Sequence, residues 1–134
     1  MKARRIGILG GTFNPVHIGH MLLAEWVWDT LALDEVWFMP TGCSYLKTNA
    51  DILPGRERLR MTELATQDHP FFRSVDLEVV REGYTYSYET LEQLKRQYPQ
   101  NEFFFIVGAD CLFGIENWKN PRRIFDACTL AAAV

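Results

Sequence analysis

The main fold signal of this chain lies in residues 6–20, which read IGILGGTFNPVHIGH. The apolar run Ile6–Leu9 predicts a buried strand. Gly10 and Gly11 should end that strand in a tight turn, because glycine tolerates backbone conformations that other residues avoid. Apolar residues at helical spacing then predict a helix from about Ile18 to Leu31. A strand, a glycine turn and a helix in this order indicate the first unit of an α/β sheet.

Short apolar runs alternate with amphipathic segments along the remainder of the chain. Further strands are predicted at Val36–Met39, Phe72–Val80, Phe103–Val107 and Thr129–Val134. Further helices are predicted over Arg56–Gln67, over Tyr88–Tyr98 and after Asn120–Pro121. Because strands that alternate with helices need crossover connections, we expect a Rossmann-like open α/β sheet, mostly parallel, with helices on both faces. Ligands bind such sheets beyond the carboxyl ends of the strands, so one rim should hold residues 10–20, 40–47 and 108–110.

Some details inside these elements can also be predicted. The helix at 56–67 should turn three residues inward, namely Leu59, Leu64 and Ala65. Its arginines are interpreted mostly as a solvated face: Arg56, Arg58 and Arg60. Glu82 and Gly83 indicate a turn, and Ser87 is the expected N-cap of the helix that follows.

The composition is that of one globular domain. The chain has 134 residues, of which 48% are hydrophobic and 23% charged, and its net charge is −3. This charge disfavours a nucleic-acid-binding surface, since phosphate backbones are bound by clustered Lys and Arg. No apolar run approaches the roughly 20 residues that a membrane span needs. We therefore expect neither nucleic acid nor membrane as a partner, and whether the chain forms a homo-oligomer stays open.

The cysteines favour a reducing compartment. Cys43, Cys111 and Cys128 lie far apart and form no CxxC pair. An odd, scattered set is typical of free thiols rather than of a disulfide framework, and nothing at the N-terminus resembles a signal peptide. These observations predict a cytoplasmic protein.

His17 and His20 are the residues on which the chemistry depends. They lie three positions apart at a helix start, so they share one face and can reach one ligand. The free N–H groups and the positive end of the helix dipole favour a phosphate at this place. The chain has no GxxxxGK[ST] run, and Gly7, Gly10 and Gly11 miss the GxGxxG spacing. A phosphate site of another kind is therefore indicated.

Two other roles are open to the histidines. A zinc site is disfavoured because the spacing differs from that of HExxH and no nearby Glu or Cys completes a ligand set, so no metal-binding residue is predicted. A pair of capped, partly buried rings without a ligand is the other alternative. Two histidines on a glycine turn favour the ligand role over it.

Residues 10–20 resemble the signature of the HxGH nucleotidyltransferase superfamily, in which His17-Ile18-Gly19-His20 is the core motif. The resemblance implies transfer of AMP or CMP from ATP or CTP by in-line attack on the α-phosphate, with release of pyrophosphate. Since the attacking phosphate is already ionised, such catalysis needs mainly positioning and charge stabilisation. The catalytic residues that the resemblance implies are His17, His20 and Lys47. The implied ATP and phosphate contacts are Gly10, Gly11, Thr12, Phe13, His17, His20, Gly108 and Asp110.

Later segments resemble the nicotinate-nucleotide adenylyltransferase family in particular. Residues 81–91, REGYTYSYETL, are similar to that family's RxGxSYTxDTL, with Thr85 in place of serine and Ser87 in place of threonine. Residues 105–110, FIVGAD, and 118–121, WKNP, resemble two further family segments in the same order.

This resemblance implies a pyridine nucleotide site at Thr85, Ser87 and Trp118, with the Trp118 ring stacked on the base. Core packing is the alternative role for Trp118, and Ser87 could serve as a helix cap as well. Lys47 is an implied phosphate contact, although Leu46 replaces the family's histidine before it. The implied role of Asp110 is a contact with a ribose hydroxyl or with the adenylate end.

The family pattern continues to an ISxTxIR segment that residues 1–134 lack. We interpret the chain as one nucleotidyltransferase domain that covers about the first two thirds of that pattern and is truncated. The expected reaction joins AMP from ATP, with Mg²⁺, to nicotinate mononucleotide, giving deamido-NAD and pyrophosphate for NAD biosynthesis. One alternative is another phosphate acceptor, such as nicotinamide mononucleotide or phosphopantetheine. The other is a nucleotide-binding module without turnover.

Overall fold

The computed structural model describes residues 3–44, 52–108 and 114–133. A five-stranded sheet with strand order β4-β2-β1-β6-β7 forms the centre of this part of the chain. Its strands are β1 (Arg5–Gly11), β2 (Glu35–Pro40), β4 (Phe72–Ser74), β6 (Glu102–Gly108) and β7 (Thr129–Ala133). All four neighbouring pairs are parallel. The strand order reverses direction between β1 and β6, so the predicted Rossmann-like sheet is confirmed, with its switch point at the end of β1.

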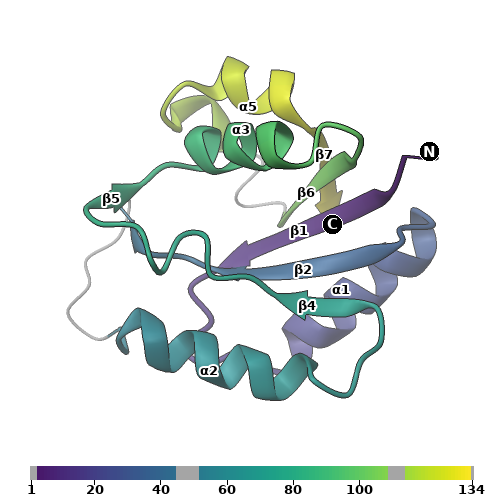
Figure 1. Cartoon of the computed structure of the whole chain (residues 1–134), viewed down its shortest axis with the longest axis vertical. Coiled ribbons are helices and arrows are strands. Elements are labelled where there is room, and N and C mark those ends of the chain that lie inside the picture. Colours follow the sequence, from purple (N-terminus) through teal and green to yellow (C-terminus); the bar gives the residue numbers. More distant parts are fainter. Residues whose placement is uncertain (1–2, 45–51, 109–113, 134) are drawn as a thin grey trace.

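Helices cover both faces of the sheet, as predicted (Figure 1). They are α1 (Ile18–Thr30), α2 (Gly55–Thr66), α3 (Ser87–Gln97) and α5 (Pro121–Ala127), with a short 3₁₀ helix, η1 (Ile115–Asn117). Figure 1 shows α1 and α2 below the sheet and α3 and α5 above it. None of the described helices is long and apolar enough to cross a membrane.

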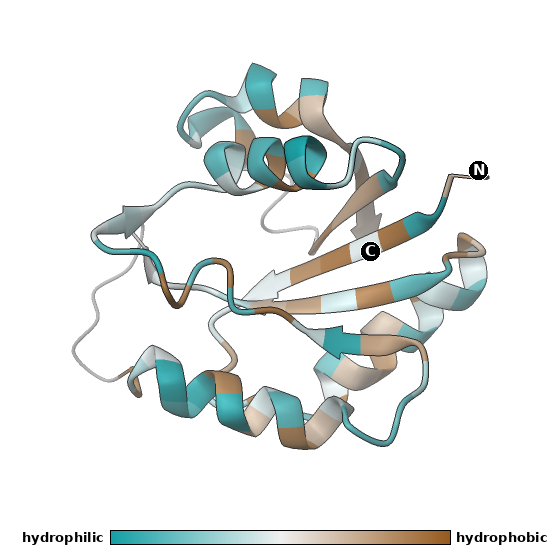
Figure 2. Cartoon of the chain, in the orientation of Figure 1, coloured by the Kyte–Doolittle hydropathy of each residue, from teal (hydrophilic) through white to brown (hydrophobic). Residues whose placement is uncertain are grey.

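Two apolar cores, one on each face, explain why the strands are continuous apolar runs. In β1, Ile6 and Ile8 join the core under α3 and α5, whereas Leu9 joins the core above α1. In β6, Phe103 and Phe105 share the first of these cores, and Phe104 lies in the second. Successive side chains of a strand point to opposite faces, so a strand covered on both faces has no polar position. Figure 2 shows this hydrophobic colouring along the central strands.

A second, two-stranded sheet lies beside the main one. It pairs β3 (Cys43–Ser44) with β5 (Tyr84–Thr85) in parallel. The predicted turn at Glu82–Gly83 precedes β5, and Gly83 has a positive φ of 75° that glycine adopts without strain. This small sheet ties the chain after β2 to the segment that leads into α3.

The predicted strand at Phe72–Val80 is wrong beyond Ser74. The edge strand β4 pairs only with Val36–Phe38 of β2, after which the chain enters a turn closed by a bond from Val80 N to Asp76 O. The apolar residues of this turn still pack on the core, which is why their pattern resembled a strand. Ser87 is likewise not the N-cap of α3, because Tyr86 holds that position and Ser87 is the first helical residue.

The inward face predicted for helix α2 is only partly right. Leu59 and Ala65 are half-buried, whereas Leu64 is 47% exposed and the fully buried residues are Arg58, Thr62 and Thr66. The two threonine hydroxyls donate to helix carbonyls one turn back, at 2.9 and 3.0 Å, and thus bury polar groups at little cost. The interpretation of the α2 arginines as a solvated face is therefore wrong for Arg58, which is 4% exposed.

Candidate active site

The glycine turn follows β1 at the carboxyl edge of the sheet. β1 extends through Gly11, which is paired with Pro40 of β2, so the strand ends later than predicted. After it, Phe13 adopts a positive φ of 50° and folds its ring back against Gly11, where a Cβ would lie 3.0 Å from that ring. The Phe13 ring is 2% exposed and meets His20 edge-on at 4.9 Å. Phe13 therefore supports His20, and only its backbone is free for the contact with ATP that the sequence predicted.

His17 and His20 form the N-terminal cap of α1. The His17 Nδ1 atom accepts the Gly19 N–H at 3.1 Å, and the His20 Nδ1 atom accepts the His17 N–H at 3.0 Å. The two rings stack with their centroids 3.8 Å apart. Because each Nδ1 is an acceptor, a neutral ring carries its proton on Nε2. The pair thus offers two Nε2–H donors at the positive end of the α1 dipole, which suits an anionic ligand.

The environment keeps His20 neutral. Burial against its neighbours lowers the pKa of His20 below its ordinary value of 6.5, and the nearby His17 lowers it further. The positive end of the α1 dipole acts in the same direction. At neutral pH the His20 ring is therefore an uncharged donor at Nε2 and an acceptor at Nδ1.

Gly19 makes room for the imidazole of His17. A Cβ at position 19 would lie 2.9 Å from His17 Cε1 and 3.0 Å from His17 Nδ1, closer than real contacts allow. The ring can take its place over the helix start only because residue 19 has no side chain. This contact is a physical reason for glycine between the two histidines.

The ends of β1, β2 and β6, which form the described part of the predicted ligand-binding rim, lie side by side at one edge of the sheet. Thr41, just after β2, donates its N–H to the Gly11 carbonyl at 2.8 Å. Gly108 ends β6, the strand on the other side of β1, and is exposed with open space around it. Lys47 and Asp110 lie outside the described residues, so their predicted roles stay predictions.

The predicted pyridine-site residues lie in two segments that meet. Lys119 Nζ, next to Trp118, lies 5.4 Å from the ring centroid of Tyr86, the N-cap of α3 that precedes Ser87. The Trp118 ring is half-buried and packs edge-on against Phe105 at 6.1 Å. Part of the Trp118 ring therefore packs on the core, as the alternative role proposed for it requires.

Thr85 is 6% exposed, and its hydroxyl lies close enough to the Glu78 carboxyl to act toward lowering the pKa of that group. The ligand contact of Thr85 stays a prediction.

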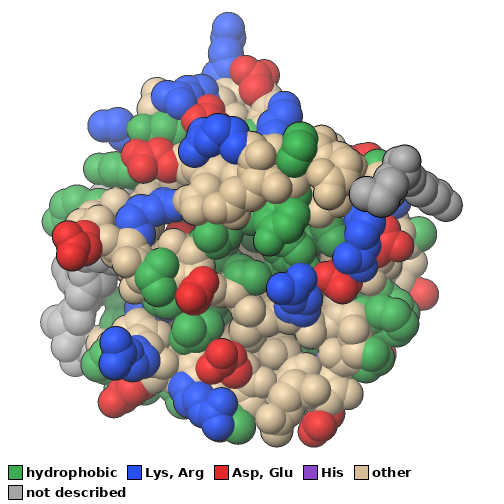
Figure 3. All heavy atoms as spheres, in the orientation of Figure 1, with side chains coloured by type: hydrophobic (Ala, Val, Ile, Leu, Met, Phe, Trp, Pro, Cys, Tyr) green, Lys and Arg blue, Asp and Glu red, His purple; other side chains and the backbone are tan. Residues whose placement is uncertain are grey.

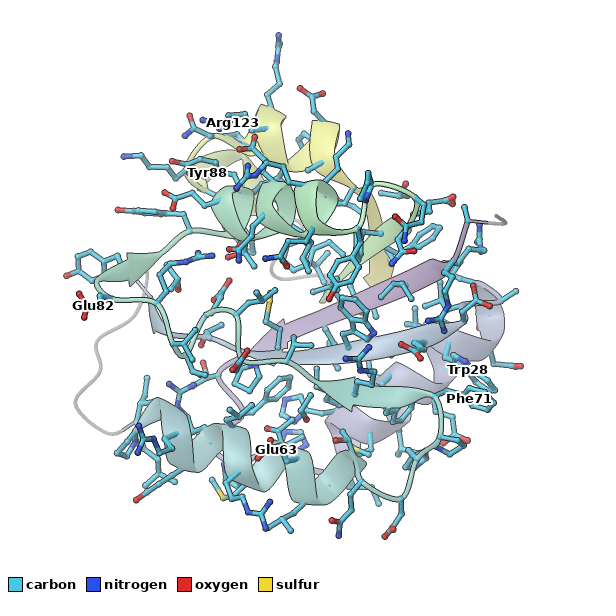
Figure 4. All side chains as sticks on the ribbon, in the orientation of Figure 1. Trp28, Glu63, Phe71, Glu82, Tyr88 and Arg123 are labelled. Atoms are coloured by element: carbon cyan, nitrogen blue, oxygen red, sulfur yellow. The ribbon has the colours of Figure 1, made fainter. Side chains whose placement is uncertain are left out.

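Contacts between α3 and α5 fix the relative position of these segments. Arg123 of α5 forms an ion pair with Glu92 of α3, and its guanidinium lies 4.6 Å from the Tyr88 ring centroid. Figure 4 shows the Tyr88 and Arg123 side chains close together at the top of the molecule. On the face seen in Figure 3, basic and acidic side chains are interspersed, without a basic patch of the kind that binds nucleic acid.

A buried carboxyl group, Glu78, was missed by sequence reasoning. It is 4% exposed and accepts the Thr90 hydroxyl at 2.9 Å, and Thr85 and the Gly42 N–H lie close to its carboxyl. Burial raises the pKa of Glu78 above its ordinary value, although these groups and the charge of Arg81 oppose the shift. An acidic residue inside the apolar run at 75–80 was the available signal.

Arg81 completes this polar cluster. Its guanidinium donates to the Thr90 hydroxyl at 2.9 Å and to Gln93 Oε1 at 2.6 Å, both on α3.

In the described ranges, no group of three or more His, Cys, Asp or Glu side chains is arranged to hold a metal ion.

Known proteins resemble the chain over almost its whole length. The cytidylyltransferase-like family model matches residues 8–134. A probable nicotinate-nucleotide adenylyltransferase of Dehalococcoides mccartyi is 44% identical over 134 residues, which are 99% of this chain and 66% of the relative. One of Geobacillus thermodenitrificans is 41% identical over 93% of this chain and 58% of the relative. The chain thus spans about two thirds or less of these relatives.

The fold has solved counterparts as well. The Plasmodium falciparum nicotinic acid mononucleotide adenylyltransferase complexed with NaAD superposes with a TM-score of 0.79 at 18% identity, over 97% of this chain and 74% of that one. At that identity the likeness concerns the fold. The predicted family resemblance is confirmed by the relatives, and the matched residues 8–134 include both histidines. This chain belongs to the cytidylyltransferase-like family.

Proposed function

We propose that the protein transfers the adenylyl group of ATP to nicotinate mononucleotide, giving deamido-NAD and pyrophosphate in NAD biosynthesis. The observation that carries the proposal is the histidine pair, whose Nδ1 atoms accept backbone N–H groups at the start of α1 and leave Nε2–H for a phosphate. The names of the relatives support the choice of the pyridine acceptor. The scattered cysteines favour a reducing compartment, so we place the reaction in the cytoplasm.

The reaction needs no proton transfer by the protein. A phosphate oxygen of nicotinate mononucleotide attacks the α-phosphorus of ATP, and the bond to the leaving pyrophosphate breaks as the new P–O bond forms. Negative charge grows on the transferring group and on the leaving group. The Nε2–H groups of His17 and His20 and the positive end of the α1 dipole would stabilise that charge.

The remaining contacts follow from placement along the rim. Backbone N–H groups of residues 10–13 would face the ATP phosphates, together with Gly108, and Lys47 and Asp110 remain proposed contacts outside the described residues. Ser87 and Trp118 would bind the pyridine nucleotide, because their two segments meet at Tyr86 and Lys119.

Mg²⁺ would accompany ATP. The ion keeps several waters and is commonly bound through one or two carboxylates plus substrate phosphates. The described residues offer no cluster of three metal-ligating side chains. The phosphate oxygens of ATP would therefore supply most of the Mg²⁺ ligands other than water. When bound, Mg²⁺ would neutralise charge on the leaving pyrophosphate.

A test of the acceptor combines calorimetry with an assay of pyrophosphate release. We expect turnover with nicotinate mononucleotide, and at least about tenfold lower kcat/KM with nicotinamide mononucleotide or phosphopantetheine. No binding of nicotinate mononucleotide would refute the proposed acceptor. Binding of ATP without pyrophosphate release from any acceptor, by this chain and by a C-terminally extended one, would instead establish a nucleotide-binding module.

Replacing Gly19 with alanine should separate activity from stability. The new methyl group would displace the His17 imidazole, so we expect turnover to fall about tenfold. Stability should change by less than about 0.5 kcal/mol, because the helix preference of alanine offsets the loss of the cap bond that His17 Nδ1 makes to the N–H of residue 19. Pyrophosphate release and thermal unfolding measure the two effects. Leu22→Ala, at a 59% exposed position of the same helix, is the control, and equal turnover in both variants would contradict the role of this contact.

A further inference from the structure

A single buried guanidinium, that of Arg58, holds three backbone segments together. Its Nε donates to the Leu53 carbonyl at 2.8 Å, and its Nη1 donates to the carbonyls of Thr12 at 2.9 Å and Thr41 at 2.7 Å. These carbonyls belong to the glycine turn, to the chain after β2 and to the segment before α2. Leu53 also donates its N–H to Asn14 Oδ1 at 3.0 Å, which ties the same turn to α2 a second time.

Arg58 and Glu78 bind opposite sides of one peptide group. The carbonyl of Thr41 accepts from Arg58 at 2.7 Å. Gly42, whose N–H belongs to the same peptide unit, packs directly on Glu78, since a Cβ at Gly42 would lie only 2.4 Å from the Glu78 carbonyl oxygen. Its N–H faces the Glu78 carboxyl and acts to lower the pKa of that group. The carbonyl and the N–H of a trans peptide point in opposite directions, so the cation and the carboxyl lie on either side of it. Both side chains are 4% exposed. Hydrogen bonds in such a chain polarise one another in a low-dielectric interior.

Arg58 and Glu78 also contact the two halves of the proposed site, one half each. Arg58 holds Thr12 in the nucleotide turn, which we define as residues 10–20. Glu78 accepts from Thr90, which lies three residues beyond the acceptor segment, defined as residues 84–87, and its carboxyl lies close to Thr85 inside that segment. The path from one half to the other therefore runs through Arg58, the Thr41–Gly42 peptide and Glu78.

We propose that Arg58, the Thr41–Gly42 peptide and Glu78 form a bridge that sets the separation between the nucleotide turn and the acceptor segment, and hence the in-line approach of the two phosphates. This inference rests on the proposed adenylyl transfer. Neither side chain needs to touch a substrate, so both are positioning residues. In-line transfer depends steeply on such placement, since a misplacement of about 1 Å can cost about 100-fold in rate.

Three variants and a control test the bridge. Arg58→Lys keeps a cation, but an ammonium lacks the planar fork that reaches several carbonyls at once. Glu78→Gln keeps the size of the side chain and removes its charge, and the third variant combines the two changes. Arg60→Lys is the matched control, because Arg60 lies on the same helix with a side chain that is 68% exposed.

A positioning role predicts a loss in kcat rather than in binding. We expect each single variant to lose about 10- to 100-fold in kcat, while the Kd of ATP and that of nicotinate mononucleotide, each measured alone by calorimetry, change less than about threefold. The double variant should be no slower than the slower single variant, because both changes release the same peptide. The control should keep the kcat of the wild type.

Other outcomes would overturn the bridge. A folded Arg58→Lys or Glu78→Gln protein with kcat within about twofold of wild type would show that the separation is set elsewhere. A double variant that loses the product of the two single losses would show independent roles. Loss of both binding affinities together with a lowered Tm would show a purely structural role.

A spectroscopic readout separates failure of the bridge from failure of the proposed function. If the wild type releases no pyrophosphate, the proposed function fails, and the bridge is judged by the amide resonance of Phe13. The Phe13 N–H shares its peptide with the Thr12 carbonyl that Arg58 holds. We expect Glu78→Gln to shift this resonance in the wild-type background and not in the Arg58→Lys background. An unmoved resonance in both backgrounds would overturn the bridge.

Discussion

Replacing His20 with alanine is expected to lower turnover about 100- to 1,000-fold while the fold survives, which is the usual cost of removing one preorganised donor to a developing oxyanion. His20 lies at the start of α1 and contributes one of two Nε2–H donors. Its removal also leaves the His17 N–H without its acceptor, so a loss of up to about 1 kcal/mol in stability is expected. Pyrophosphate release at saturating substrates and chemical unfolding measure these effects.

Two comparisons make the result for His20 decisive. Glu25→Ala changes an exposed residue of the same helix and should leave turnover unaltered. An NMR titration of the wild type should place the pKa of His20 below 6.5, in keeping with its burial and the neighbouring His17. Turnover of His20→Ala equal to that of the wild type would contradict a role in stabilising the transition state.

Replacing Glu78 with alanine should cost about 3 kcal/mol of unfolding free energy, because removing one member of a buried polar cluster leaves the other members without partners. The groups affected are the hydroxyls of Thr85 and Thr90 and the Gly42 N–H, and Arg81 loses the carboxyl that faces it. Urea unfolding at neutral pH measures the loss. A loss below about 0.5 kcal/mol, as is usual for surface substitutions, would mean that these groups find other partners.

The pH dependence of stability gives a second test of Glu78. Burial raises its pKa in the folded protein above the ordinary value of 4.5, so the folded state binds the proton more tightly than the unfolded state. Its contribution to stability is therefore complete below pH 4.5 and decreases as the pH rises through the raised pKa. We expect the stability of wild type relative to Glu78→Gln to fall over that window. A difference that rises with pH would show that bonding to the carboxylate outweighs burial.

Much of the fold followed from local pattern. Continuous apolar runs such as Phe103–Val107 indicated strands buried on both faces, and both faces of β6 are indeed covered. The same holds for the histidine pair, whose spacing at a helix start determines that both rings lie on one face. Helix starts and parallel strands obey short-range rules, so a single sequence is enough to locate them.

Errors arose where a distant partner decides the outcome. Leu64 faces solvent and Arg58 faces inward. The reason is that three backbone carbonyls outside α2 accept hydrogen bonds from the buried Arg58 guanidinium. The strand predicted beyond Ser74 ends there because the chain leaves β2, which itself continues to Pro40, and enters a turn closed by the bond from Val80 N to Asp76 O.

The sequence by itself therefore determined the order of strands and helices, the glycine turn and the two histidines on one face of α1. Each of these depends on residues within a few positions of one another. Only the tertiary structure decided that Arg58 and Glu78 are buried on either side of the Thr41–Gly42 peptide. Burying a charged group is favourable only when its hydrogen-bond partners are in place, and here those partners come from segments far apart in the chain.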